Sequence, residues 1–108
     1  MIISSHLCLL TDGSYGHFPL VVLNDNGLIT SLRLFPDGLP EVGGMRFVPG
    51  ILLANVPANI HGVSSSSRLD FARQMSPFAL AIGRSHLCAM QGVDLNSFRG
   101  SFSKLSIL

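Results

Sequence analysis

The first half of the chain alternates apolar and polar positions with the two-residue period that is typical of β-strands. Residues 2–10 form one predicted strand of this kind. Residues 18–23 form a second predicted strand, which is almost entirely apolar. The segment 24–27, Asn-Asp-Asn-Gly, separates it from a third run at 28–34, and Asn-Gly between apolar runs favours a tight hairpin. A fourth strand is predicted over 45–53.

The second half begins with signals that favour helices. Ser67 and Asp70 have the spacing of a capping box and predict a short helix over 68–75. A Ser-Pro pair follows and predicts a second helix over 77–91, because proline suits the first helical position. A closing strand is predicted over 98–108.

This order of elements predicts an α+β fold. A mostly antiparallel β-sheet or small β-sandwich of about five strands is expected, with two short helices between the fourth and last strands. A length of 108 residues fits one domain spanning 1–108.

Charged residues are unusually scarce and change the picture at the surface. They make up 12% of the chain, against roughly 25% in ordinary soluble domains. Because so small a domain has much surface to cover, we expect part of that surface to be apolar and to be hidden in a homo-oligomer or against a protein partner. The residues predicted to line this interface come from the fourth strand and the two helical segments: Ile51, Leu52, Leu53, Val56, Phe78 and Ile82.

The same composition argues against several other classes of protein. The net charge is +1, and the arginines are scattered, so no nucleic-acid partner is expected. Residues 47–67 contain no charged residue, but their prolines, asparagines and histidine do not suit a membrane-spanning helix, and no membrane association is expected. The N-terminus lacks the basic start of a secretory signal, and two cysteines make no disulfide framework, so a cytoplasmic location is expected.

A repeated tetrapeptide, Ser-His-Leu-Cys, suggests a metal site as an alternative. It occurs at 5–8 and 85–88, and with His61 it offers five candidate zinc ligands: His6, Cys8, His61, His86 and Cys88. On a strand the first histidine and cysteine share a face. In the predicted second helix the other pair lies about 200° apart, so the two side chains diverge. Buried structural cysteines with no cofactor are therefore the favoured interpretation, and a zinc-binding Cys/His domain is the alternative.

The serine run Ser64–Ser67 offers no catalytic pattern. It lacks the motif of a nucleophile elbow, and a serine cluster before a helix is typical of capping. No catalytic residue is predicted, and a small hydrolase would need a concave pocket that contains a perturbed histidine.

Three segments resemble parts of the metal-dependent amidohydrolases of the urease-like superfamily. The hairpin at 22–29, the Pro-Gly strand at 47–53 with the following 59–62, and the end of the chain at 100–108 are similar to the segments that form the accessory β-domain of those enzymes. The resemblance implies a small composite β-domain beside a catalytic barrel. His61 matches one histidine of the family's metal-binding His-x-His pair, but Asn59 and Val63 stand where its partner would be.

The barrel itself has no room in this chain. It needs roughly 250 residues, whereas only some forty separate the two similar halves. The resemblance therefore implies an accessory β-domain without its catalytic barrel, or a remnant of such a metal hydrolase. Our hypothesis is a non-catalytic α+β domain that acts by self-association or through a protein partner.

Overall fold

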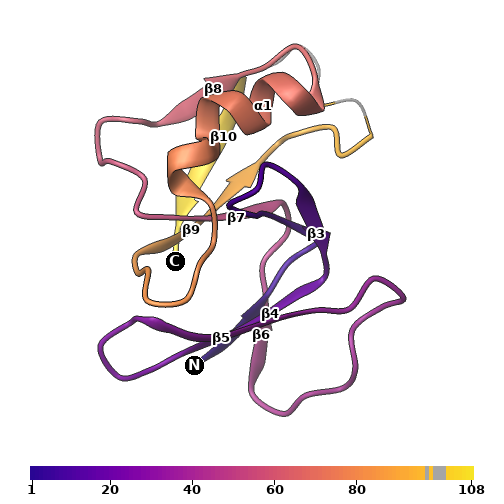
Figure 1. Cartoon of the computed structure of the whole chain (residues 1–108), viewed down its shortest axis with the longest axis vertical. Helices are drawn as coiled ribbons and strands as arrows, with labels where there is room; N and C mark the ends of the chain where they lie inside the picture. Colours follow the sequence, from indigo (N-terminus) through magenta and orange to yellow (C-terminus); the bar gives the residue numbers. More distant parts are fainter. Residues whose placement is uncertain (97, 99–101) are drawn as a thin grey trace.

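The computed structural model describes residues 1–96, 98 and 102–108. Within them the chain forms ten short strands, one α-helix and one 3-10 turn, so the expectation of about five strands with two helices is wrong. The fold is mostly β, and its elements lie in three layers (Figure 1). A six-stranded sheet in the middle has the helix on one face and a four-stranded sheet on the other.

Each sheet is mixed and contains one parallel strand pair. The four-stranded sheet has the order β5 (Ile29–Leu34), β4 (Pro19–Leu23), β1 (Ile2–Ser4) and β6 (Met45–Phe47). The six-stranded sheet has the order β3 (Tyr15–His17), β2 (Leu7–Leu9), β7 (Ile51–Ala54), β9 (Leu87–Gln91), β10 (Phe102–Ile107) and β8 (Gly62–Ser64). β1 pairs with β6, and β2 with β7, in parallel; the other neighbours are antiparallel.

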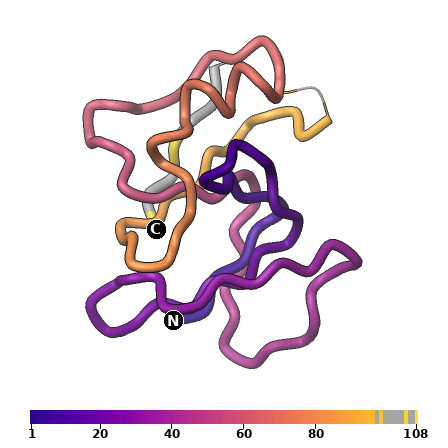
Figure 2. Tube along the Cα trace, in the orientation of Figure 1, coloured from indigo at the N-terminus to yellow at the C-terminus, as the bar shows by residue number. Residues whose placement is uncertain are grey.

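Two predicted strands each contribute to both sheets. The run 2–10 is divided into β1 and β2, and the run 45–53 into β6 and β7, so both segments pass from the four-stranded to the six-stranded sheet side by side (Figure 2). They stay hydrogen-bonded through the crossing, where Val48 donates its N–H to the Ser4 carbonyl at 2.9 Å and Leu7 to the Gly50 carbonyl at 3.2 Å. Alternation along a sequence does not reveal such a change of sheet, because the strand period continues on both sides of the break.

The middle sheet is buried on both faces, which explains its apolar runs. Along β7, Ile51 and Leu53 face the core beneath the helix, whereas Leu52 and Ala54 face the core between the sheets. β9 alternates in the same way, and every one of its first four residues is buried. These runs therefore belong to the centre of the molecule.

The first predicted helix is confirmed as α1 (Arg68–Met75). The Ser67 hydroxyl accepts the Asp70 N–H at 3.1 Å, and the Asp70 carboxylate accepts the Ser66 N–H at 2.9 Å. These two bonds satisfy backbone donors at the start of the helix. Phe71 and Met75 then pack into the core on the middle sheet.

The second predicted helix is wrong. Only a 3-10 turn, η1 (Ser76–Phe78), follows α1, and residues 87–91 form β9. Gly83, with φ of +87°, lies in the loop between them, where Arg84 binds the Ala79 carbonyl at 2.7 Å. A short apolar run bounded by glycines fits a buried strand as well as a helix, and here strand pairing with β7 and β10 decides.

The closing strand is confirmed in its main part. β10 (Phe102–Ile107) pairs with β9 and β8, whereas positions 99–101 of the predicted strand lie outside the described residues. In the part of the chain that the structure describes, no helix has the length and apolar character to cross a membrane.

Candidate functional site

The most distinctive surface is the side of the four-stranded sheet that points away from the rest of the molecule. Ile3, Val21 and Leu32 turn inward to the core between the sheets. Because side chains alternate along a strand, their neighbours turn outward. We call these outward-facing apolar residues the outer face: Ile2, Leu20, Val22, Met45 and Phe47.

The strand register places the outer face in two rows. In one row Val22 of β4 lies beside Ile2 of β1, and Ile2 lies beside Met45 of β6. In the next row Leu20 and Phe47 flank Ser4, which is fully buried and donates its hydroxyl to the Pro19 carbonyl. Five apolar side chains thus form one continuous patch on three adjacent strands.

None of these five side chains packs into either hydrophobic core. Four are partly exposed, and Phe47 keeps 42% of its surface accessible. An antiparallel sheet with one wet face normally carries polar residues there, whereas apolar residues on both faces are typical of a sheet covered on both sides. This sheet therefore has the sequence of a covered layer but is covered on one side by its own chain.

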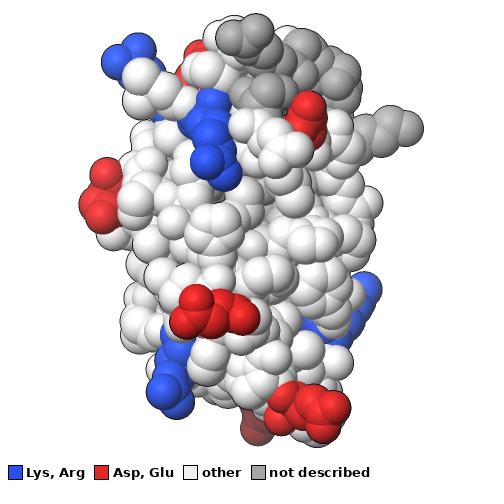
Figure 3. Space-filling view, turned by 90° about the vertical axis from the view of Figure 1, so that its right-hand side faces the viewer, with Lys and Arg blue, Asp and Glu red and all other residues white. Residues whose placement is uncertain are grey.

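Charge is sparse in and around this surface. Among the described residues of the two rows, one side chain is charged: Arg33 of β5, which is paired with Leu20. Figure 3, which shows another side of the molecule, has a few charged groups of both signs on a mostly uncharged surface. The desolvation of charges would therefore cost little if the outer face were covered.

The structure places the residues predicted to line an interface in three different environments. Ile51, Leu52 and Leu53 are fully buried in the middle sheet, so they do not reach a surface. Val56 and Phe78 are partly buried against the core beneath the helix. Ile82 alone among the six is strongly exposed, at 63%, in the loop before β9. The apolar segment 51–53, which the sequence predicted to line an interface, therefore lies at the centre of the fold.

The two cysteines face opposite sides of the middle sheet. Cys8 lies in the core between the sheets, and Cys88 lies in the core beneath the helix, where its thiol is 3.7 Å from the Leu53 carbonyl oxygen. Both are free thiols. Burial raises the pKa of each to about 11, from 9.0, so neither supplies a thiolate near neutral pH.

The histidines that the sequence proposed as ligands do not converge with them. His6 accepts the Gly50 N–H at 3.3 Å, His61 is exposed on the loop before β8, and His86 is exposed at the start of β9. Among the described residues, no three His, Cys, Asp or Glu side chains lie close enough together to hold a metal ion. The argument that a helix turns His86 and Cys88 apart was wrong, since Cys88 lies in strand β9 and His86 directly precedes it. The two side chains are nevertheless in different environments, because Cys88 is buried and His86 is exposed.

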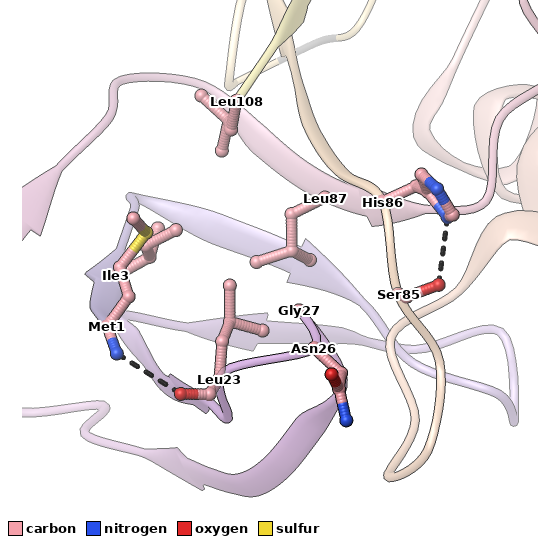
Figure 4. Close-up of a pocket in the computed structure, with 9 residues that line it drawn as sticks. All are labelled: Met1, Ile3, Leu23, Asn26, Gly27, Ser85, His86, Leu87 and Leu108. Carbon is pink, nitrogen blue, oxygen red and sulfur yellow. Dashed lines mark hydrogen bonds between the residues drawn. The ribbon is translucent and has the colours of Figure 1, made fainter.

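A pocket of about 280 Å³ opens where the two sheets meet near both ends of the described chain (Figure 4). Met1, Leu23, Leu87 and Leu108 give it an apolar interior, and the Ser85 hydroxyl lies 2.8 Å from His86 Nδ1 at its rim. A serine nucleophile needs a histidine that a third group orients, and no carboxylate is among the described lining residues. The pair therefore does not form a catalytic triad.

The outer face could have been found in part from the sequence. The run Phe18–Leu23, Phe-Pro-Leu-Val-Val-Leu, has consecutive apolar residues, which predict burial on both faces of a strand. The sequence around Ile2 and Met45 does not predict that they belong to the outer face. Their position in the same row as Val22 follows from the order of the strands in the sheet.

No protein-family model, curated protein or solved structure matches this chain.

Proposed function

We propose that this chain is a non-catalytic domain that acts by self-association, with its outer face packed against the same face of a second copy. The observation that carries this proposal is the five-residue apolar patch that belongs to neither core. Sheets pack face to face at a separation of roughly 10 Å with interdigitating apolar side chains, and a two-fold axis would bring identical patches together.

The charge balance supports a second copy as the occupant. At a net charge of +1, two copies repel each other weakly, and the rows of the outer face contain one arginine and no carboxylate. A strongly charged partner would find no complementary charges there. A neutral, apolar surface fits best against another surface of the same kind.

Light scattering coupled to size-exclusion chromatography tests the proposal directly. We expect the wild-type chain to elute at micromolar concentration with twice the mass of one chain. The substitution Val22→Glu places a charge within the patch, beside Ile2, and an unpaired charge in an interface should raise the dissociation constant about a hundredfold or more. This variant should therefore elute as a monomer.

Leu69→Glu is the matched control. Leu69 is an apolar residue of α1 with 60% of its surface exposed, and α1 lies on the opposite side of the molecule from the outer face. This variant should keep the wild-type mass, and circular dichroism should show that both variants remain folded. A monomeric wild type, or equal dissociation of the Val22→Glu and Leu69→Glu variants, would contradict self-association through the outer face. A different protein would then be the candidate partner that covers this face.

Kinship with the accessory β-domain of urease-like amidohydrolases is part of the same proposal. It is supported by the way strands from the two parts of the chain share one sheet, because β7 of the first half pairs with β9 of the last quarter. Of the similar terminal segment, positions 100 and 101 lie outside the described residues. A crystal structure in which the last quarter of the chain does not share a sheet with the first half would contradict this kinship.

The free thiols also support the expected compartment. Cys8 and Cys88 are buried on opposite faces of a sheet and form no disulfide, as is usual for proteins of the reducing cytoplasm.

A further inference from the structure

A second hollow, of about 390 Å³, lies where β2 and β3 meet the start of α1. Its polar lining residues are His6, His17, Arg68 and Asn96, and its apolar lining includes Phe18 and Leu95. No Asp or Glu is among the described residues that line it. A hollow with one permanent cation, two histidines and no carboxylate favours an anionic occupant.

Arg68 is held in place by two aromatic rings. Its guanidinium carbon lies 5.5 Å from the centre of the Tyr15 ring and 5.1 Å from that of Phe98. The Tyr15 hydroxyl donates to the Arg68 carbonyl at 2.6 Å, which fixes the backbone as well. Because the side chain is already ordered, a ligand that binds it loses less conformational entropy in doing so.

His6 is held in one tautomer. Its Nδ1 accepts the Gly50 N–H, so in the neutral ring the proton lies on Nε2 and that nitrogen is a donor. The ring is packed edge-on against Phe47, with centroids 5.0 Å apart. His6 also lines an adjoining hollow of about 300 Å³ beside Pro49 and Gly92, so the two hollows share this side chain.

From this arrangement we propose that the hollow between His6, His17 and Arg68 binds a small organic anion. Its carboxylate or phosphate accepts hydrogen bonds from Arg68, His6 and His17, and its apolar part lies against Phe18 and Leu95. The charged group specifies the ligand class, because a carboxylate and a phosphate both match the planar donors of a guanidinium. The hollow adjoins the outer face at the contact between His6 and Phe47, but none of the five outer-face residues lines it. The anion site does not require the proposed self-association.

Titrations of the ¹⁵N-labelled protein followed by NMR test this proposal. The probes are benzoate and phenyl phosphate, with benzyl alcohol as the uncharged control of similar shape. We expect both anions to shift the amide signals of Leu7, Phe18 and Leu95, which line the hollow, and the alcohol to leave them in place. The anion that binds with the higher affinity shows whether the hollow prefers a carboxylate or a phosphate. Equal shifts with the alcohol, or no shifts with either anion at millimolar concentration, would overturn the proposal.

Arg68→Gln should weaken binding of the preferred anion about tenfold or more, because a charge-assisted hydrogen bond is lost. Arg73→Gln is the control, since Arg73 is an exposed arginine of the same helix that does not line the hollow. It should change the affinity less than about twofold, as expected for loss of a distant surface charge. Equal weakening by both substitutions would show a nonspecific charge effect and would overturn the site.

Arg68 also packs on two rings, so its variant is checked by circular dichroism before titration. If that variant is unfolded, His17→Ala takes its place, because His17 is exposed on the edge strand β3. The expected effect is then a loss of affinity of about threefold or more, the value for one hydrogen-bond donor. An unchanged affinity in a folded His17→Ala variant would count against the site. Failure here would leave the mass measurements on the outer face unaffected.

Discussion

Gly50 occupies a point at which only a glycine fits. Its φ is +110°, and a Cβ there would lie 2.3 Å from the Met90 carbonyl oxygen. Gly50→Ala should therefore lower the free energy of unfolding by about 2–4 kcal/mol, measured by urea denaturation, because backbone strain and overpacking add. Gly43→Ala is the control: its Cβ would meet nothing within 4 Å, and stability should change by less than about 1 kcal/mol. Equal stabilities of the two variants would contradict this account of the crossing.

Helix α1 depends on its first turn, because eight residues are too few for a helix to be stable alone. Ser67→Ala removes the acceptor for the Asp70 N–H and should lower the free energy of unfolding by about 1 kcal/mol. Ser67→Asn keeps a capping oxygen and should recover most of that loss. Thermal unfolding followed by circular dichroism measures both variants, and an alanine variant as stable as wild type would show that packing of Phe71 and Met75 alone holds the helix.

The whole molecule should lose stability at alkaline pH through its two buried thiols. The folded pKa of Cys8 and of Cys88 is about 11, whereas an unfolded thiol titrates near 9.0. Unfolding therefore releases protons above pH 9, and the free energy of unfolding should fall between pH 9 and 11 by about 2 kcal/mol per thiol. Urea denaturation at several pH values measures this slope. The variant with both cysteines replaced by alanine should show a smaller slope, and an equal slope would contradict the assignment.

Local interactions decided the elements that the sequence predicted correctly. The Asn24 side chain accepts the N–H groups of Asn26 and Leu28 at 3.0 Å, and Gly27 takes a φ of +79°, so the hairpin turn follows from residues within it. The limits of α1 likewise follow from Ser67 at its start. Such bonds join residues a few positions apart, and the pattern of residue types is enough to reveal them.

Long-range pairing decided the rest. The segment 87–91 is a strand because β7 and β10 offer it hydrogen bonds on both sides, and no local signal distinguishes that outcome from a helix. The two runs 2–10 and 45–53 pair with each other in both sheets, so they pass from one sheet to the other together. The outer face exists only through that strand order, which brings Ile2, Val22 and Met45 together from three distant parts of the chain. The sequence determined that few charged residues are available to cover the surface, and the tertiary structure decided where the apolar side chains lie, because register and sheet order assign each side chain to the interior or to the outer face.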